Sequence, residues 1–525
     1  MPQRPYGGPE NSGRRHFAIR AAAMATASKV GAATAASKPD KLVRVTDFGA
    51  DPTGGKNSTI AFQAAAAAIN AARGGTLVIP PGRYIVGAQR FAGAPHKGYA
   101  YKAESILSIA QCTSPVVIEG NGAVLKLANG LKFGSFDPVS GARFDPPSLP
   151  FTKSDYAAHA CWGMVQLLNN QGAIAVRNLG LDGNISNLVL GGAFGDTGRQ
   201  LAAYGIWAYG NSKVDIENVH THHHGLDGIV IGYRGLTATS PEYPHTLLGV
   251  VSEYNARQGL SWVGGTRLTA SKCKFNHTGK AVFASAPGAG FDIEAEASVC
   301  RNGTFEDCEF ADNSGVGMVA DSGDGADVSF RNCTFWGTTS WAIWPRKPGF
   351  SFHNCKMIGP SVNPFASPDA AKATQFFGCL FTDEQLYRGA IYGKGKPSSM
   401  LIDMTSAQHV LFDSCRVVAQ YQKLGNIGAA TIRNCTFEQK TGAELLPDKD
   451  WTLILRGCTL ESDRFIDAIA EPPAHAYYIS VTGNTIKNGV EVISLKGKWK
   501  WGNWSWGVTG MISKSGSSPS GAAAK

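Results

Sequence analysis

The chain has 525 residues, of which 63 are glycine and only 17% are charged, and its formal net charge is +9. Such a composition suits many short strands joined by tight turns. The positive excess is small for this length and forms no Lys/Arg block, which argues against a nucleic-acid-binding arm. It mildly favours an anionic partner such as a uronate-bearing polysaccharide.

Residues 1–40 are expected to be an export signal and a linker. Gly13-Arg14-Arg15-His16-Phe17 resembles a twin-arginine signal, and an Ala-rich segment follows, with a cleavage site at Ala33-Thr34-Ala35. The alternative is a disordered Ala-rich tail, because Arg20 and Lys29 interrupt the apolar region. On this signal-like segment we predict an exported protein, periplasmic or secreted. No later segment is long and apolar enough for a membrane span.

Residues 43–87 predict a strand, a helix and a further strand. Asn57 or Ser58 can cap a helix whose Ala-rich body ends at Gly74-Gly75. This passage closely resembles the N-terminal segment of the pectate-lyase-3 type of β-helix proteins, shared by polysaccharide lyases, glycoside hydrolases and bacteriophage tailspikes. The resemblance implies a helix that covers the open end of a parallel β-helix and hides the edge of its first rung.

The next segments alternate between irregular stretches and strands. Residues 88–165 are predicted to be loops that could form one wall of a cleft, and residues 191–198 another loop. Strands are expected at 174–181 and 214–219.

One short phrase then recurs, in which a cysteine is followed two residues later by an apolar side chain; it starts at Cys273, Cys308, Cys333, Cys355, Cys379, Cys415, Cys435 and Cys458. Residues two apart in a strand share a face, so each cysteine and its apolar partner should both point inward. We therefore expect a ladder of free, buried thiols rather than disulfides. Cys112, Cys161 and Cys300 fall outside this ladder.

This repeat predicts the fold. A strand at each interval of 20 to 36 residues, without helices between, fits an all-β, right-handed parallel β-helix solenoid with an N-terminal capping α-helix. We assign residues 41–490 to this domain and 491–525 to a Trp-rich strand with a disordered tail. Its four tryptophans between Trp499 and Trp506 could pack over the last rung or stack on sugar rings.

A second set of strands aligns on glycine and carries the candidate site; the strands start at Asp227, Gln258, Ala289, Ser314 and Ser340. If Ile229, Leu260, Phe291, Val316 and Ala342 point inward, Asp292 and Glu294 must point outward, about 7 Å apart along one strand. Rung stacking then brings Tyr233, Asp321, Arg346 and Lys347 within one or two rungs of them.

Three chemistries remain open for this face. Two carboxylates at this spacing suit an inverting glycosidase. The same acids, with Asp321, could instead hold Ca²⁺ against a uronate carboxyl group and permit β-elimination by Lys347, Arg346 or Tyr233 as the base. The third possibility is a non-catalytic, tailspike-like glycan-binding module.

Further candidates lie just before these strands. Among His220, His222, His223 and His224, a neutral histidine beside a carboxylate could act as a general base, and we favour His224 with Asp227. Arg257 and Gln258, with Trp262 and Tyr233, are predicted to bind sugar carboxylates, hydroxyls or rings.

We accordingly predict an exported enzyme that cleaves a polysaccharide, with β-elimination on an acidic polymer slightly favoured over hydrolysis. No cofactor is assigned beyond the possible Ca²⁺. The predicted partner is the polysaccharide, with neither nucleic acid nor a membrane span, and a homotrimer is possible.

Overall fold

The structure is a computed structural model that describes residues 41–93, 98–146, 155–195, 198–338, 340–383, 400–420, 422–439, 451–456, 458–461, 478–482, 485–487, 499–501 and 504–506. The predicted export signal at 1–40 and the tail beyond 506 therefore lie outside the described residues. The chain divides into two compact units, residues 1–226 and 227–525. No helix in the described ranges is long and apolar enough to cross a membrane.

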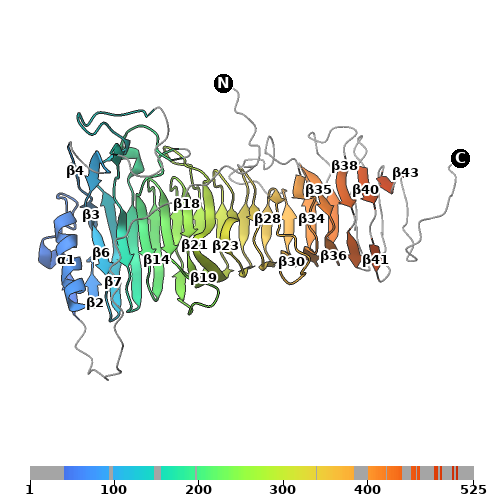
Figure 1. The fold of residues 1–525 in the computed structure, drawn as a ribbon, viewed down its shortest axis with the longest axis horizontal. Helices are drawn as coiled ribbons and strands as arrows, with labels where there is room; N and C mark the ends of the chain where they lie inside the picture. The colour runs from blue at the N-terminus through green and yellow to red at the C-terminus, as the bar shows by residue number, and fades with distance from the viewer. Residues whose placement is uncertain are drawn as a thin grey trace, which may run out of the picture. The chain divides into compact units, whose positions relative to one another are not determined.

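The first unit begins with a short strand and a helix. After β1 (Leu42–Arg44) and the 3-10 helix η1 (Val45–Phe48), α1 spans Thr59–Ala72. Asn57 Oδ1 accepts a hydrogen bond from the Thr59 backbone N–H at 2.9 Å, which supplies the expected helix start. The buried face of α1, which includes Phe62 and Ile69, packs against β1, β2 (Gly75–Val78) and β6 (Leu107–Ala110). Figure 1 shows α1 beside β2 and β6. The predicted capping helix is thus present.

The strands of the first unit form three parallel stacks. The first joins β1, β2 and the opening halves of β7 (Val116–Leu127), β11 (Ile174–Asp182) and β14 (Val214–His222); the second joins β3 (Arg83–Val86) to the later halves of these long strands; and the third joins β6, β10 (Gly163–Leu168) and β13 (Tyr204–Tyr209). An aliphatic column of Leu77, Ile118, Val176 and Ile216 fills the interior.

Residues 88–165 are more regular than predicted. They contain β6, β7, β10 and most of a separate five-stranded sheet of β4 (Gln89–Phe91), β5 (Tyr101–Ala103), β8 (Lys132–Ser135), β9 (Ala157–Ala158) and β12 (Val189–Leu190). The short helix η2 (Ile185–Asn187) precedes β12. These strands have only two to four residues in the extra sheet, which is too short to show a clear alternation in the sequence.

The second unit winds through three parallel sheets. The first sheet contains β15 (Asp227–Gly232), β18 (Gln258–Trp262), the opening half of β21 (Ala289–Glu306), β23 (Met318–Gly325), β26 (Ile343–Pro345), β29 (Ser361–Val362), β32 (Met400–Met404), β35 (Lys423–Gly428), β38 (Trp451–Arg456), β40 (Tyr478–Thr482) and β42 (Trp499–Trp501). β43 (Trp504–Trp506) pairs with β42 in antiparallel fashion.

The second sheet contains β16 (His245–Leu248), β19 (Gly265–Ser271), the later half of β21, β24 (Val328–Arg331), β27 (Phe350–His353), β30 (Gln375–Phe377), β33 (Leu411–Asp413), β36 (Thr431–Arg433), β39 (Thr459–Glu461) and β41 (Thr485–Lys487). The third sheet contains β17 (Val251–Glu253), β20 (Lys274–Asn276), β22 (Glu309–Ala311), β25 (Thr334–Trp336), β28 (Lys356–Ile358), β31 (Leu380–Thr382), β34 (Arg416–Ala419) and β37 (Thr436–Gln439).

Seven of the eight recurring cysteines, from Cys273 to Cys435, lie in the turn between the second and third sheets. Cys458 lies between β38 of the first sheet and β39 of the second, so its predicted place in the ladder is wrong. All eleven cysteines are free and buried, which confirms the predicted thiols and excludes the disulfide alternative. Phenylalanines stack beside them: Phe305, Phe330, Phe352, Phe376 and Phe412 form one column with ring centroids 5.0 to 5.1 Å apart. This spacing matches the separation of neighbouring strands, so the aromatic stack holds successive rungs in register.

Candidate functional site

Outward-facing side chains on the first sheet of the second unit form the candidate site. Ile229, Leu260 and Phe291 pair in register and are fully buried in the core. The next residues, including Ser261 and Asp292, consequently point away from the core. Asp292 therefore faces outward as predicted. It is nevertheless only 1% exposed, so the expectation of a solvated carboxylate at this position is wrong.

Two rungs of the prediction require correction. Phe291 pairs with Met318, which pairs with Ile343, so these residues occupy the inward positions that we had assigned to Val316 and Ala342. Val316 instead belongs to an apolar cluster with Ala289, Val319, Trp344 and Val362, against which Trp341 packs. Along the outward column, Asp292 is followed by Val319 and then Trp344, so the face changes from polar to apolar over successive rungs.

Arg257 joins the two carboxylates at the centre of the site. Its Nη1 lies 3.4 Å from Asp227 Oδ2, and its Nη2 lies 2.6 Å from Glu294 Oε1. The side chains of Asp227, Arg257 and Glu294 are 1%, 12% and 21% exposed, respectively. Glu294 is therefore the carboxylate that solvent or a substrate meets first, while Asp227 lies at the buried end of the bridge.

Neighbouring polar residues hold the acids in place. Ser261 Oγ donates a hydrogen bond to Asp227 Oδ2 at 3.0 Å, and Gln258 Nε2 donates one to Asp292 Oδ2. Gln258 is fully buried, so its predicted contact with substrate is replaced by a role in orienting Asp292. Ser261 was not predicted, although it alternates with Leu260 and Trp262 in the same way that Asp292 alternates with Phe291 and Ile293.

The electrostatics of Asp227 are unusual for a carboxyl group. Burial raises its pKa from 3.8 to about 7. The positive charge of Arg257 opposes this rise, and the negative charge of Glu294 adds to it. The hydrogen bonds from Ser261 and Arg257 also oppose the rise. Buried Asp227 and partly exposed Glu294 share a single guanidinium, so ionising both would leave an uncompensated negative charge. Asp227 consequently holds a proton close to neutral pH, and its Oδ1 accepts no hydrogen bond from the described residues.

Three further predicted residues lie just after these strands. Tyr233 follows β15 and stacks on Tyr243 with centroids 4.6 Å apart, and burial together with the Tyr243 hydrogen bond raises its pKa to about 12. Lys347 Nζ donates to the Gly323 carbonyl at 2.7 Å, and burial lowers its pKa against the opposing charges of Asp321 and Asp324. Arg346 is exposed and begins the turn after β26.

The possible calcium site is not formed. Glu294 pairs with Ser322 across a β-bulge, which removes Asp321 from the position opposite Glu294. Glu294 contacts Arg257, and Asp292 contacts Gln258. Across the described ranges, no group of three or more His, Cys, Asp or Glu side chains is placed to hold a metal ion. The proposed trio of Asp292, Glu294 and Asp321 is therefore withdrawn.

Trp262 is a core residue and not a sugar-binding one. It is fully buried and pairs with Ile231 and Ile293 in an inward column. Glycines make room for its indole: an added Cβ would lie 2.9 Å from Trp262 Nε1 at Gly265 and 3.1 Å from Cζ3 at Gly303. The structure therefore overturns its predicted contact with substrate.

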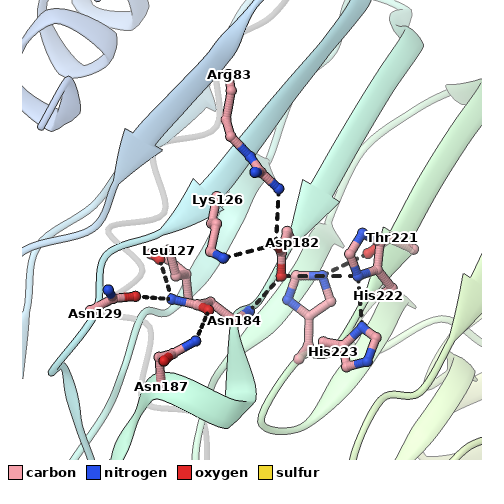
Figure 2. Close-up of polar contacts among 11 residues, drawn as sticks. Arg83, Lys126, Leu127, Asn129, Asp182, Asn184, Asn187, Thr221, His222 and His223 are labelled. Atoms are coloured by element: carbon pink, nitrogen blue, oxygen red, sulfur yellow. Dashed lines mark hydrogen bonds and ion pairs between the residues drawn. The ribbon is translucent and has the colours of Figure 1, made fainter. Parts of the chain in front are cut away.

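The histidines belong to a separate polar network in the first unit, which Figure 2 shows. Asp182 lies at its centre, with Lys126 Nζ at 3.7 Å, Arg83 Nη2 at 3.9 Å and His222 Nδ1 at 3.9 Å. His222 Nδ1 lies 2.8 Å from His223 Nδ1. Asp182 is buried, and its Oδ1 also accepts a hydrogen bond from the Asn184 backbone N–H at 2.8 Å.

His224 does not have the predicted access to substrate. It is fully buried, its Nε2 lies 2.9 Å from Thr221 Oγ1, and burial holds its pKa well below 6.5, with the nearby charges of His222 and His223 acting in the same direction. A neutral imidazole in this environment cannot reach a polysaccharide at the surface. Its predicted role as a general base is therefore withdrawn.

Comparisons with known proteins support the fold. Residues 167–357 match a family model described as the right handed beta helix region, which confirms the predicted handedness. No curated protein sequence matches the chain.

Several solved structures are similar in fold. The AlgE4 A-module of the Azotobacter vinelandii mannuronan C-5 epimerase is 15% identical, with a TM-score of 0.38, covering 86% of this chain and 98% of that one. The Thermotoga maritima exopolygalacturonase is 10% identical, with a TM-score of 0.27 and coverages of 91% and 95%. The tailspike protein of E. coli bacteriophage HK620 is 12% identical, with a TM-score of 0.40 and coverages of 85% and 71%. At these scores and identities, no activity is transferred to this chain.

Proposed function

We propose that this protein is a carbohydrate-active enzyme that hydrolyses glycosidic bonds of a polysaccharide bound across β15, β18 and β21. The observation that carries the proposal is the pair of acids on one guanidinium, Asp227 and Glu294, with the Asp227 pKa raised to about 7. Glycoside hydrolysis requires one carboxyl group that donates a proton and a second that acts as a carboxylate. Perturbed pKa values of this kind concentrate at catalytic sites.

The two acids have different roles in this proposal. Glu294 reaches solvent and would activate water or stabilise positive charge on the sugar, whereas Asp227 holds the proton for the leaving oxygen. Asp227 becomes accessible when the Arg257 side chain moves outward. A uronate carboxylate would draw Arg257 in that direction by a bidentate ion pair, which favours an acidic polymer and agrees with the net charge of +9. The apolar cluster with Trp341 offers a neighbouring surface for sugar rings.

The test is a cleavage assay on a panel of acidic and neutral polysaccharides, with reducing ends and the ultraviolet absorbance of unsaturated uronates measured in parallel. Hydrolysis predicts new reducing ends without the absorbance. Glu294→Gln and Asp227→Asn should each lower turnover by at least about 100-fold. Glu296→Gln is the matched control, because Glu296 lies on the same strand and is exposed. If Glu294→Gln and Asp227→Asn are as active as the Glu296→Gln control, the assignment of Asp227 and Glu294 to the active site is wrong.

A second candidate function is β-elimination, which Lys347 favours. Its lowered pKa increases the fraction of free amine, which is the form that removes a proton from C5 of a uronate. This mechanism predicts both signals in the same assay, and it predicts that Lys347→Met abolishes them. If neither new reducing ends nor the absorbance appears with any polysaccharide of the panel, the protein would instead be a binding module. Export and trimer formation remain predictions, to be tested by cell fractionation and by light scattering.

A further inference from the structure

A second groove lies on a different sheet of the second unit. It encloses about 510 Å³ and is lined by Glu242, Arg267, Thr269, Asn302, Gly303, Thr304, Asp327, Val328, Ser329 and Gly349. These residues belong mainly to β19, the later half of β21 and β24, which form the second sheet. The Asp227 and Glu294 pair lies on the first sheet, so the groove is a separate feature of the surface.

The groove lies on a ladder of hydroxyl-bearing residues. Thr246, Thr269, Thr304, Ser329 and Ser351 occupy the same register position on five consecutive strands. The three central members, Thr269, Thr304 and Ser329, line the groove. Their neighbours on either side are core residues, so all five hydroxyls face outward. Adjacent strands are about 4.8 Å apart, a spacing comparable to the length of one pyranose residue. Each hydroxyl can both donate and accept a hydrogen bond, as the hydroxyls of a sugar can.

The edge of the groove consists of residues in the left-handed conformation. Arg267, Asn302, Asp327 and Gly349 have φ values of 70°, 59°, 58° and 73°. At Gly349 a side chain would collide with the edge, because its Cβ would lie 2.3 Å from Asp327 Oδ1. Asn302 and Asp327 are exposed and present an amide and a carboxylate beside the ladder. Ser329 Oγ is buried and has no hydrogen-bond partner among the described residues, so Thr269 and Thr304 supply the hydroxyls of the groove lining.

The charges of the groove decide which sugars it can take. Glu242 and Asp327 are acidic, and the one cation, Arg267, is already paired with Glu242 at 3.0 Å. The groove lining therefore has a formal charge of −1, which repels a uronate and favours hydrogen bonds from neutral sugar hydroxyls to carboxylate oxygens.

We propose that this groove binds a neutral polysaccharide segment along the direction in which the strands stack. Such a site would hold the protein on a polymer without cleaving it. The inference is independent of the proposed hydrolysis, because it rests on a different sheet and predicts binding rather than turnover.

The experiment is native affinity electrophoresis of the full chain in gels that contain galactomannan, soluble starch or dextran, with alginate and polygalacturonate gels run in parallel. At least one neutral polymer should retard the protein. Thr304→Val removes one hydroxyl from the middle of the ladder without changing side-chain shape, and it should weaken that retardation by about fivefold to tenfold. Thr334→Val is the control, because Thr334 faces outward on β25 of the third sheet.

The outcomes separate cleanly. The proposed binding site is supported if a neutral polymer retards the protein, Thr304→Val weakens this retardation, and Thr334→Val leaves it unchanged. No retardation in any of the three neutral gels would overturn it, as would equal retardation of both variants. Retardation confined to the acidic gels and lost in Thr304→Val would overturn the neutral-ligand assignment. A chain that binds but shows no cleavage would contradict only the hydrolytic proposal.

Discussion

Burial shifts the pKa values of His159 and His224 in the first unit and that of Asp227 in the second unit in opposite directions. The first unit encloses His159 and His224, whose pKa values burial lowers, to about 4 for His159 and well below 6.5 for His224. The second unit encloses Asp227, whose pKa burial raises to about 7. Both imidazoles are neutral and inaccessible, whereas Asp227 is linked through Arg257 to a carboxylate that reaches solvent. Burial of an ionisable group alone therefore does not identify a candidate active site. Asp227 is a candidate because ion pairs through Arg257 link it to the partly solvent-exposed carboxylate of Glu294.

This comparison predicts opposite dependences of stability on pH. A histidine with a lowered pKa binds fewer protons in the native state than in the unfolded chain below pH 6.5, so its unit loses stability on acidification. An aspartate with a raised pKa keeps a proton that the unfolded chain has released, so its unit loses stability as the pH rises from about 4 to about 7.

The largest expected effect comes from removing the shared cation. Arg257→Met removes the cation that Asp227 and Glu294 share and should lower the free energy of unfolding by about 3–5 kcal/mol at pH 8. At pH 5 the loss should be smaller, since protonation can neutralise the acids. Urea denaturation at the two pH values measures this difference. An equal loss at both would show that the effect is one of packing and not of charge.

Asp227→Asn should act in the opposite direction. Asparagine cannot ionise, so the variant lacks the loss of stability that wild type suffers between pH 4 and 7. A pKa rise from 3.8 to about 7 corresponds to roughly 4 kcal/mol as an upper limit. We expect a higher unfolding midpoint than wild type at pH 8 and a similar one at pH 4. A variant that is less stable at pH 8 would contradict the assigned proton.

In the first unit, His159→Phe should remove part of the acid sensitivity. His159 stacks on Trp162 with centroids 4.5 Å apart, and phenylalanine can keep this aromatic contact. A pKa lowered from 6.5 to about 4 corresponds to a loss of about 3 kcal/mol on acidification in wild type. Thermal unfolding between pH 4 and 7 should therefore be flatter in the variant. Unchanged acid sensitivity would assign this behaviour to other groups.

The smallest effect is expected at Ser261. Its hydroxyl donates a hydrogen bond that stabilises the ionised form of Asp227 by about 1 kcal/mol. Ser261→Ala removes this hydrogen bond and should therefore raise the Asp227 pKa further. The alkaline fall in stability, and any fall in activity that depends on the Asp227 proton, should move to higher pH. Titration of both signals against pH measures this shift. A shift to lower pH would reverse the assigned direction of the hydrogen bond.

Much of the fold was predictable because it depends on local alternation. Each cysteine and the apolar residue two positions later share an inward face, and this rule predicted the strands of the third sheet from Cys273 to Cys435. The rule was wrong for Cys458, because the strand that follows it pairs with β36 of the second sheet. It failed where a turn changes length. Val316 was aligned on its preceding glycine, but the chain places Met318 opposite Phe291.

The site was harder to predict because it depends on contacts between rungs. Trp262 was misassigned because the space that it fills is created by Gly303, some 40 residues later in the chain. The alternation placed Asp292 on the correct face but could not show that Gln258 covers it. The bridge from Asp227 through Arg257 to Glu294 joins three successive rungs, and no local pattern encodes it.

The column of thiols offers a way to observe how the second unit comes apart. Each of its seven cysteines, from Cys273 to Cys435, belongs to its own turn, and burial raises the pKa of thiols such as Cys355, so alkylating reagents cannot attack them in the intact coil. A turn that frays would expose one sulfur at a time. The order in which these seven positions become labelled would therefore record from which end the coil unwinds.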